Sequence, residues 1–529
     1  MLGLELIVVL LSAVLVGNAL GRRLRVAPPV LLLAFGVLLG FAPTLREVHL
    51  PPEVVLLVFL PALLFWEALN ISLQQIRRTL RGIVLVSTLL VILTAAAVAA
   101  TAHWLGMPWG AAWVLGAAVA PTDATAVAVV SRLIPRRQLT VLRAESLVND
   151  GTALVVFGLA VGVAVGEAHL TPLAVGGHFA LAYVGGAVAG LVTAWVTTRA
   201  RRLLDDLLLE NVLAILAPFA AYLLAETVEA SGVLAVVVYG LMRGQTGPRQ
   251  VRADARQVSQ AFWSLSTFAL NGALFVLVGI EVNSSVRQLT SVDLARGVAT
   301  VAAVVAVLIV VRIAFLFVSA YAIRAIDRRP SQRLRRVSNR SRVVSGLAGF
   351  RGAVSLAAAL AVPQTLESGA AFPQRDLVVF VTAGVIVVTL AQGLVLPAVI
   401  RWARLPEDTT LEEEISFAYR TAAEEAYAAI PEIARRLDTH EEVLERLLRE
   451  YDEHLGLLRA DPDGDDDELA HLAQHDRDYA ALKLELIGLK REAVVRLRDE
   501  RRIDDDTLRH LTMRLDLEEV RLSRRELVD

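Results

Sequence analysis

Long apolar runs, separated by short polar segments, recur along the first three quarters of the chain. A helix that crosses a membrane needs about 20 mostly apolar residues, and thirteen runs approach or exceed this length. They lie near residues 3–20, 26–41, 51–69, 82–102, 109–131, 139–166, 173–198, 207–227, 231–242, 259–280, 295–323, 343–363 and 376–401. We therefore predict an all-α protein that crosses a membrane about thirteen times.

Arginines alternate between the loops that join these spans. Each odd-numbered loop, counted from the N-terminus, holds at least three arginines, whereas the even-numbered loops contribute only Arg46, Arg287, Arg296 and Arg375. Loops rich in Lys and Arg face the cytoplasm. We predict a multi-pass protein of the cell inner (plasma) membrane, with its N-terminus outside and its C-terminus in the cytoplasm.

The composition changes abruptly after Arg404. Residues 405–529 are polar and charged with helical spacing, so we predict a transmembrane domain at 1–404 and a helical cytoplasmic domain at 405–529. The chain as a whole is 55% hydrophobic over 529 residues, which is too apolar for an ordinary soluble protein. It contains no cysteine, which excludes disulfide and zinc–thiolate chemistry.

The fifth predicted span carries Pro121, Thr122 and Asp123 near its middle. Proline removes a backbone hydrogen bond, and a carboxylate inside a membrane costs about 3 kcal/mol or more. Unpaired backbone at this depth is tolerated only where it is buried in protein or lines a cavity. We interpret the proline and the carboxylate together as signs of a broken helix, whose free carbonyls and Asp123 coordinate a cation. The alternative is a kinked helix with a structural aspartate.

The sixth predicted span opens with Glu145, Ser146, Asn149 and Asp150. At about 100° per residue these side chains cover an arc of roughly 140°, so we expect them to face one cavity. A hydroxyl and a carboxylate one turn apart are hard oxygen ligands, which suit a hard cation. The alternative is a set of polar residues at the inner mouth of the span.

The twelfth predicted span holds Arg351, with Gly349 and Gly352 on either side. A buried guanidinium needs a carboxylate partner, and we expect Glu145 to form a structural ion pair with it. No partner is assigned to Arg312, which lies deep in the eleventh span.

Two further polar residues of the predicted spans are interpreted individually. Glu67, near the cytoplasmic end of the third span, is interpreted either as a cation ligand or as a residue that extends to the membrane surface. Asn271, in the tenth span, is interpreted as a contact between helices.

Four segments together resemble one family of transporters. They are LPALLFWEA, APTDATAV, RAESLVNDGTALVVF and GFRGAVSLAAALAVP, in this order across most of residues 50–365. They are similar to segments of the monovalent cation:proton antiporters, in the sodium/proton exchanger branch marked by an Asn–Asp pair. The resemblance implies two inverted repeats of six helices preceded by one extra helix. It also implies crossed broken helices in the fifth and twelfth spans, and a homodimer.

The resemblance further implies which residues carry transport. The ion ligands would be Asp150, Asp123, Ser146, Glu67 and the main chain of Thr122, with Na⁺ held at Asp123, Ser146 and Asp150. Asn149 would be the Asn of the pair. Because relatives with Asp at that place tend to exchange ions electrogenically, Asn149 implies an electroneutral exchange of one ion for one proton.

These residues together predict a secondary active antiporter that exchanges Na⁺ for H⁺ and serves pH and sodium homeostasis. A carboxylate that loses its hydration holds a proton more tightly, so we expect a proton and a cation to compete for Asp150. No Walker-type loop is present, and we expect no cofactor, no enzymatic activity and no nucleic-acid partner. Exchange of K⁺ or Li⁺, a cation channel, a carrier for an organic solute and a membrane-embedded enzyme are the alternatives.

Overall fold

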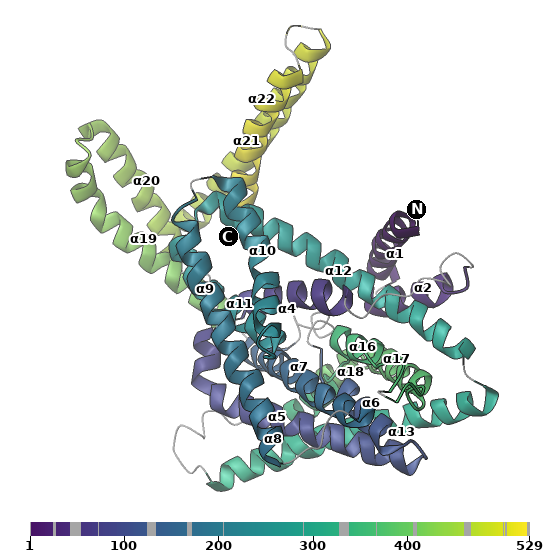
Figure 1. Ribbon diagram of the computed structural model, residues 1–529. Helices are drawn as coiled ribbons and strands as arrows, with labels where there is room; N and C mark the ends of the chain where they lie inside the picture. The colour runs from purple at the N-terminus through teal and green to yellow at the C-terminus, as the bar shows by residue number, and fades with distance from the viewer. Residues whose placement is uncertain are drawn as a thin grey trace. The chain divides into compact units, whose positions relative to one another are not determined.

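The protein folds into two helical units, Met1–Glu407 and Asp408–Asp529 (Figure 1). The computed structural model describes residues 2–24, 28–42, 54–71, 73–123, 134–166, 172–204, 206–288, 290–326, 338–366, 368–405, 410–459, 467–500, 502 and 505–525. Every predicted span coincides with helix over most of its described length. The predicted all-α class is therefore confirmed.

One group of helices in the Met1–Glu407 unit packs mainly against itself, and we call it the scaffold bundle. Its members are α1 (Leu2–Leu24), α2 (Pro28–Leu39), the π-helix η2 (Val55–Phe59), α4 (Leu60–Leu69), α8 (Pro172–Ala180), the π-helix η4 (Leu181–Gly185), α9 (Gly186–Arg201), α10 (Leu207–Glu226), α11 (Gly232–Gln250) and α12 (Ala253–Gln288). Because α8, η4 and α9 follow one another directly, they form one continuous rod.

A second group of helices in the same unit forms the core bundle. Its members are α5 (Leu73–Trp104), α6 (Trp109–Val119), α7 (Arg136–Val165), α13 (Ser291–Ile326), α15 (Asn339–Leu347), α16 (Ala353–Leu360), α17 (Arg375–Gln392) and α18 (Leu396–Ala403). Residues 124–131 of the fifth predicted span lie outside the described residues. The two bundles meet mainly where α12 packs on α17 and where α11 passes α5 and α7.

Helices α2 and α12 of the scaffold bundle approach backbone to backbone. A Cβ atom added to Gly36 would lie 2.0 Å from the carbonyl oxygen of Val276, and one added to Gly279 would lie 2.3 Å from that of Leu33. No larger residue fits at either position. Small residues at helix contacts let the backbones come close, which is how helices associate inside membranes.

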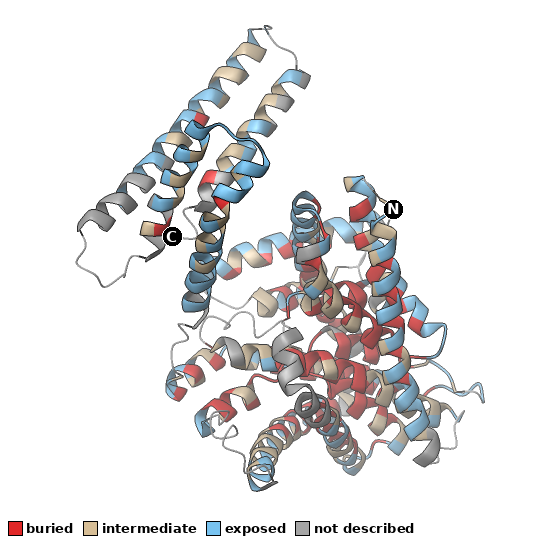
Figure 2. Ribbon diagram, turned by 90° about the vertical axis from the view of Figure 1, so that its left-hand side faces the viewer, coloured by how far each residue is buried: buried red, intermediate tan, exposed pale blue. Residues whose placement is uncertain are grey.

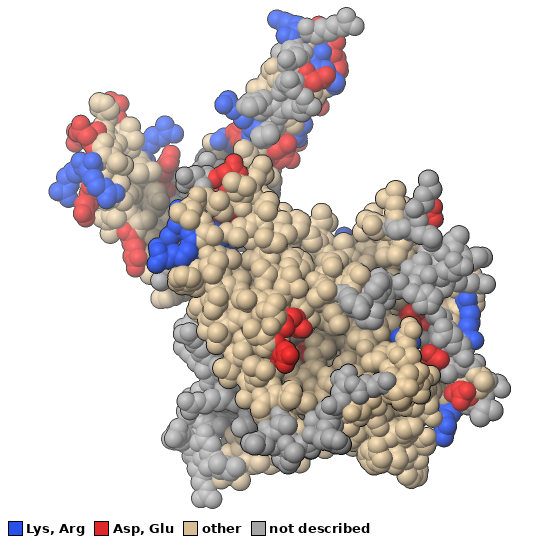
Figure 3. Space-filling model, viewed as in Figure 1, with Lys and Arg blue, Asp and Glu red and all other residues tan. Residues whose placement is uncertain are grey.

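The surface of the Met1–Glu407 unit fits a membrane. Buried residues gather inside the bundles (Figure 2), and large apolar side chains such as Trp195 and Leu208 stay exposed on the outer helices. The face seen in Figure 3 is mostly uncharged over this unit. Among the described residues, eight helices are long and apolar enough to cross a membrane. The protein is therefore a multi-pass membrane protein, while the count of about thirteen spans stays a prediction.

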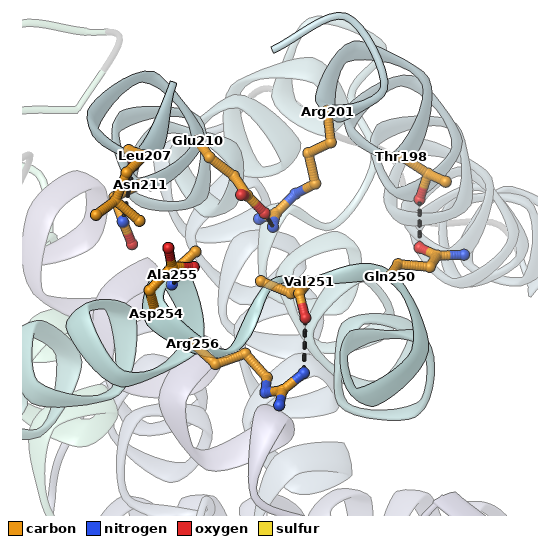
Figure 4. A network of polar contacts seen from close by, with 10 residues as sticks. All are labelled: Thr198, Arg201, Leu207, Glu210, Asn211, Gln250, Val251, Asp254, Ala255 and Arg256. Atoms are coloured by element: carbon orange, nitrogen blue, oxygen red, sulfur yellow. Dashed lines mark hydrogen bonds and ion pairs between the residues drawn. The ribbon is translucent and has the colours of Figure 1, made fainter. Parts of the chain in front are cut away.

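Polar contacts fix the ends of α9, α10, α11 and α12 (Figure 4). Arg201 Nη1 lies 2.9 Å from Glu210 Oε1, and both side chains are more than nine-tenths buried. Asp206 caps α10 by accepting hydrogen bonds from backbone N–H groups of its first turn. Arg256 Nη1 donates to the carbonyl of Val251 at 2.6 Å. These contacts join the helix ends of the scaffold bundle on one side.

The Asp408–Asp529 unit consists of two pairs of helices. Helix α19 (Thr410–Arg436) packs on α20 (Glu441–Arg459), and α21 (Asp467–Asp499) packs on α22 (Asp505–Arg525). Arg491 of α21 pairs with Asp516 of α22 at 2.7 Å and also contacts Glu519. The cytoplasmic location of this unit stays a prediction.

Candidate functional site

The end of α6 meets an interrupted helix in the core bundle. Helix α6 ends at Val119 and the chain is not helical from Ala120 to Asp123, while α15 and α16 are separated by the stretch 348–352. The backbone N–H of Asp123 donates to the carbonyl of Phe350 at 2.8 Å, as a single antiparallel bridge. Because Pro121 has no N–H, the helix cannot continue its hydrogen bonding there. The predicted crossing is confirmed for the residues that the structure describes, up to Asp123 on one side and across 348–352 on the other.

The crossing is tight at Gly352. A Cβ atom added at this position would lie 1.7 Å from Asp123 Oδ2, which no side chain tolerates. The absence of a side chain at Gly352 therefore allows the carboxylate of one break to rest against the backbone of the other.

The Arg351 side chain donates hydrogen bonds to backbone carbonyls at the two breaks. Its side chain is buried, its Nε donates to the carbonyl of Val119 at 3.1 Å, and its Nη1 donates to the carbonyl of Gly349. The Val119 carbonyl belongs to the C-terminal end of α6, where the helix dipole is negative. The guanidinium thus satisfies carbonyls at both breaks and offsets that negative end.

Glu145 pairs with Arg312, so the predicted pair of Glu145 with Arg351 is wrong. Arg312 Nη1 lies 2.9 Å from Glu145 Oε1, with both side chains at least nine-tenths buried, and Arg312 Nε donates to the carbonyl of Ser345 at 3.1 Å. Arg312 comes from α13, which packs on α15. The positive charge that offsets the Glu145 carboxylate therefore comes from Arg312 of α13. The guanidinium of Arg351 instead donates hydrogen bonds to carbonyl groups.

The polar face of α7 lies against the break that follows α6. Ser146 Oγ donates to the main-chain carbonyl of Thr122, and the Asn149 side-chain amide lies 3.2 Å from Thr122 Oγ1. With the amide oriented so that its oxygen accepts from Thr122, its nitrogen lies 3.3 Å from the carbonyls of Glu145 and Ser87. This orientation satisfies both ends of the amide. Ser146, Asn149 and Thr122 are all buried.

A cavity lies beside the crossing, between the two bundles. Three acids from different elements line it: Glu67 of α4, Asp123 of the break and Asp150 of α7. The cavity wall also includes Thr122, Asn271 of α12 and Ser355 of α16. Of the predicted ligands, Ser146 is not part of this wall; its hydroxyl donates to the main-chain carbonyl of Thr122.

Asn271 and Ser355 are the wall residues that the sequence did not single out as ligands. Ser355 Oγ is buried without a hydrogen-bond partner, and Asn271 was interpreted as a contact between helices. Within the part of the chain that the structure describes, no three His, Asp or Glu side chains are arranged to hold a metal ion by themselves. A cation in this cavity therefore needs hydroxyl, amide or main-chain oxygens beside the acids.

A multi-pass helical protein in which the end of α6 meets an interrupted helix beside three acids has the features of a membrane transporter. The chain belongs to the sodium/hydrogen exchanger family, because the family described as "Sodium/hydrogen exchanger, transmembrane" matches residues 9–402. The resemblance found in the sequence is thereby confirmed. Cation/proton antiport is the activity class of this family, which consists of transporters and not of enzymes.

Two curated relatives extend this likeness. The chain is 46% identical over 523 residues to an uncharacterized Na⁺/H⁺ exchanger of Mycobacterium tuberculosis (strain ATCC 25618 / H37Rv), covering 98% of this chain and 96% of that protein. It is 30% identical over 400 residues to the sodium, potassium, lithium and rubidium/H⁺ antiporter of Bacillus subtilis (strain 168), covering 73% and 59% of the two chains.

A solved structure shares the fold. The sodium proton antiporter MjNhaP1 from Methanocaldococcus jannaschii at pH 8 matches with a TM-score of 0.57 at 18% identity. The match covers 76% of this chain and 99% of that one. The Met1–Glu407 unit accordingly has an antiporter fold.

Proposed function

We propose that this protein exchanges Na⁺ for H⁺ across the cell inner membrane and that Asp150 carries either ion in turn. The observation that carries the proposal is the convergence of Asp150, Asp123 and Glu67 on one cavity between the two bundles. A carboxylate held away from bulk water binds a proton or a cation to regain neutrality. Both ions therefore compete for one site, and obligatory exchange follows if the core bundle moves only when Asp150 is neutralised.

The ligands of the cation are oxygen atoms on both sides of the crossing. Asp150, Asp123 and Ser146 hold Na⁺ in our proposal, together with the main-chain carbonyl of Thr122. Ser146 lies outside the cavity wall, but its Oγ contacts the carbonyl of Thr122, a wall residue, so two hard oxygen atoms lie beside the cavity one turn from Asp150. Glu67 faces the same cavity from the scaffold bundle and contributes negative charge along the approach to the site.

Exchange is electroneutral in this proposal. Asn149 is neutral, and its amide contacts Thr122. Asp150 is therefore the one member of the Asn–Asp pair that can be charged, and it takes up either one proton or one Na⁺. Each half of the cycle then carries the same charge. A rate that depends on membrane potential in vesicles of the unmodified protein would contradict this.

The choice of Na⁺ has K⁺ and Li⁺ as alternatives. The Bacillus subtilis relative is named for four alkali cations, which supports testing each cation separately. In proteoliposomes with an imposed pH gradient, we expect Na⁺ to dissipate the gradient at the lowest concentration. A lower half-saturating concentration for K⁺ would reassign the protein as a K⁺/H⁺ exchanger.

Asp150→Asn provides the decisive test. We expect this variant to fold and to lose cation-dependent dissipation of the pH gradient. The matched control is Asp254→Asn, at a half-exposed position where the carboxylate pairs with Arg252 on the surface; this variant should exchange normally. Full exchange by Asp150→Asn would remove Asp150 from the mechanism. Sodium flux without proton counter-flux in the unmodified protein would indicate a channel.

The membrane arrangement belongs to the same proposal. We place the N-terminus outside, the C-terminus in the cytoplasm and two copies in a homodimer. Because the chain has no cysteine, a single cysteine introduced at Trp104 or at Leu203 reports its side of the membrane without background. An impermeant thiol reagent added to intact cells should label the first and spare the second. The mass of the purified particle checks the dimer.

A further inference from the structure

Tyr183 links the scaffold bundle to the core bundle by hydrogen bonds. It lies on the π-helix η4, and its hydroxyl is 3.2 Å from Thr88 Oγ1 of α5. The same hydroxyl contacts Thr152 Oγ1 of α7. One scaffold side chain therefore touches two core helices at a single point.

This point is connected to the candidate ion site. Thr152 follows Asp150 by two residues on α7, and its hydroxyl also donates to the carbonyl of Val148 at 2.9 Å. Thr88 follows Ser87, whose carbonyl lies 3.3 Å from the Asn149 amide nitrogen. Tyr183 is thus linked to Asn149 through the adjacent residues Thr88 and Ser87 of α5, and through Thr152 it contacts the turn of α7 that carries Asp150.

The local structure around Tyr183 is unusual for a simple helix contact. The rod of α8, η4 and α9 widens into a π-helix at Leu181–Gly185, and such widened turns occur frequently at functional sites. The ring of Tyr183 stacks on Phe179 with centroids 6.4 Å apart. Its hydroxyl therefore extends toward the core bundle from a ring that the scaffold bundle holds.

We propose that Tyr183 is a positioning residue that holds the core bundle in the described orientation against the scaffold bundle. The inference rests on the proposed function, in which one bundle moves against the other to carry the ion. The bonds of Tyr183 to Thr88 and Thr152 must break when the bundles slide. They therefore set how much of the protein occupies this orientation, while the ion ligands stay unchanged.

Removing the Tyr183 hydroxyl tests the proposal. Tyr183→Phe keeps the ring and loses the hydrogen bonds, and a neutral bond is worth about a two- to tenfold change in an equilibrium. Tyr222→Phe is the matched control, because Tyr222 is a buried scaffold tyrosine whose hydroxyl bonds Glu226 on the same helix. Thr152→Val and Thr88→Val remove the partner hydroxyls one at a time.

The readout is the distance between the bundles in the full-length protein. Nitroxide labels at Trp104→Cys on α5 and Leu203→Cys at the end of α9 give this distance by pulsed electron resonance, since both positions are highly exposed and the chain has no other cysteine. We expect Tyr183→Phe to change the ratio of distance populations about two- to tenfold. Thr152→Val should change it in the same direction, and the double variant should add little.

The exchange assay supplies a second readout. Tyr183→Phe should change the maximal exchange rate, because the hydrogen bonds that must break when the bundles slide are lost while every ion ligand is kept. The proposal is overturned if Tyr183→Phe leaves the distance populations unchanged, or if Tyr222→Phe shifts them equally. Absence of exchange by the unmodified protein would instead refute the proposed function, since the distance measurement does not depend on transport.

Discussion

Arg312 of α13 and Glu145 of α7 form a buried ion pair, with Arg312 Nη1 2.9 Å from Glu145 Oε1. The pair joins the helix that carries Asp150 to a helix that carries none of the proposed ion ligands. A buried pair contributes little compared with apolar residues of the same volume, but loss of one partner leaves an unpaired charge in the interior. The pair therefore fixes the position of α7 within the core bundle.

The first prediction concerns this pair. Glu145→Leu alone and Arg312→Met alone should each destabilise the protein by about 3–5 kcal/mol, because each leaves a buried charge without its partner. The double variant should recover most of the loss, as measured by unfolding in detergent. Combining Glu145→Leu with Arg351→Met is the control for partner choice. Recovery in that combination, and not in the first, would assign the pair to Arg351.

The second prediction concerns the crossing. Gly352→Ala should abolish exchange and lower stability, because its Cβ would lie 1.7 Å from Asp123 Oδ2 and force the two breaks apart. Gly158→Ala on α7 is the control, since a Cβ there meets nothing within 4 Å and alanine favours a helix by up to about 1 kcal/mol. Stability and exchange rate should both be kept in that variant. Normal exchange by Gly352→Ala would mean that exchange does not require the close contact between Asp123 and Gly352.

The third prediction concerns pH. If a proton and Na⁺ compete for Asp150, lowering the pH fills the site with protons and raises the Na⁺ concentration needed for half-maximal exchange. Where the site is mostly protonated, the rise should approach about tenfold per pH unit, because one proton displaces one cation. The maximal rate at saturating Na⁺ should not change. A falling maximal rate with a constant half-saturating concentration would indicate separate sites for the two ions.

The fourth prediction concerns the second unit. A chain that ends at Glu407 should fold and exchange ions, because Met1–Glu407 is compact by itself and contains the whole cavity. The check is cation-dependent dissipation of a pH gradient by the shortened and full-length proteins at equal amounts in vesicles. A shortened protein that folds but does not exchange would make Asp408–Asp529 a required part of the transporter.

Much of the fold follows from the sequence because each physical signal is local. Apolar runs of span length predicted the helices, and Pro121 predicted the break in the fifth span. The break in the twelfth span was implied by the resemblance to the antiporter family. The spacing of Glu145, Ser146, Asn149 and Asp150 predicted that all four face one cavity. Of these only Asp150 lines the cavity, because helix geometry gives the direction of a side chain but not the neighbour that it meets.

The partner of Glu145 was not predictable in the same way. Both Arg312 and Arg351 lie deep in apolar spans, and the pairing depends on which helix is the neighbour of α7 in space. The sequence also gave no reason to select Ser355, because a lone serine in an apolar helix more often bonds its own backbone. Contacts between helices distant in the sequence decide both cases.

The glycine contact between α2 and α12 has a mechanical consequence. Where Gly36 and Gly279 meet, two backbones touch with no side chain between them to change rotamer and absorb a shift. The scaffold bundle is therefore rigid where α2 and α12 touch. The relative movement of the bundles that the proposed exchange requires is then confined to the boundary with the core bundle, where longer side chains can exchange partners.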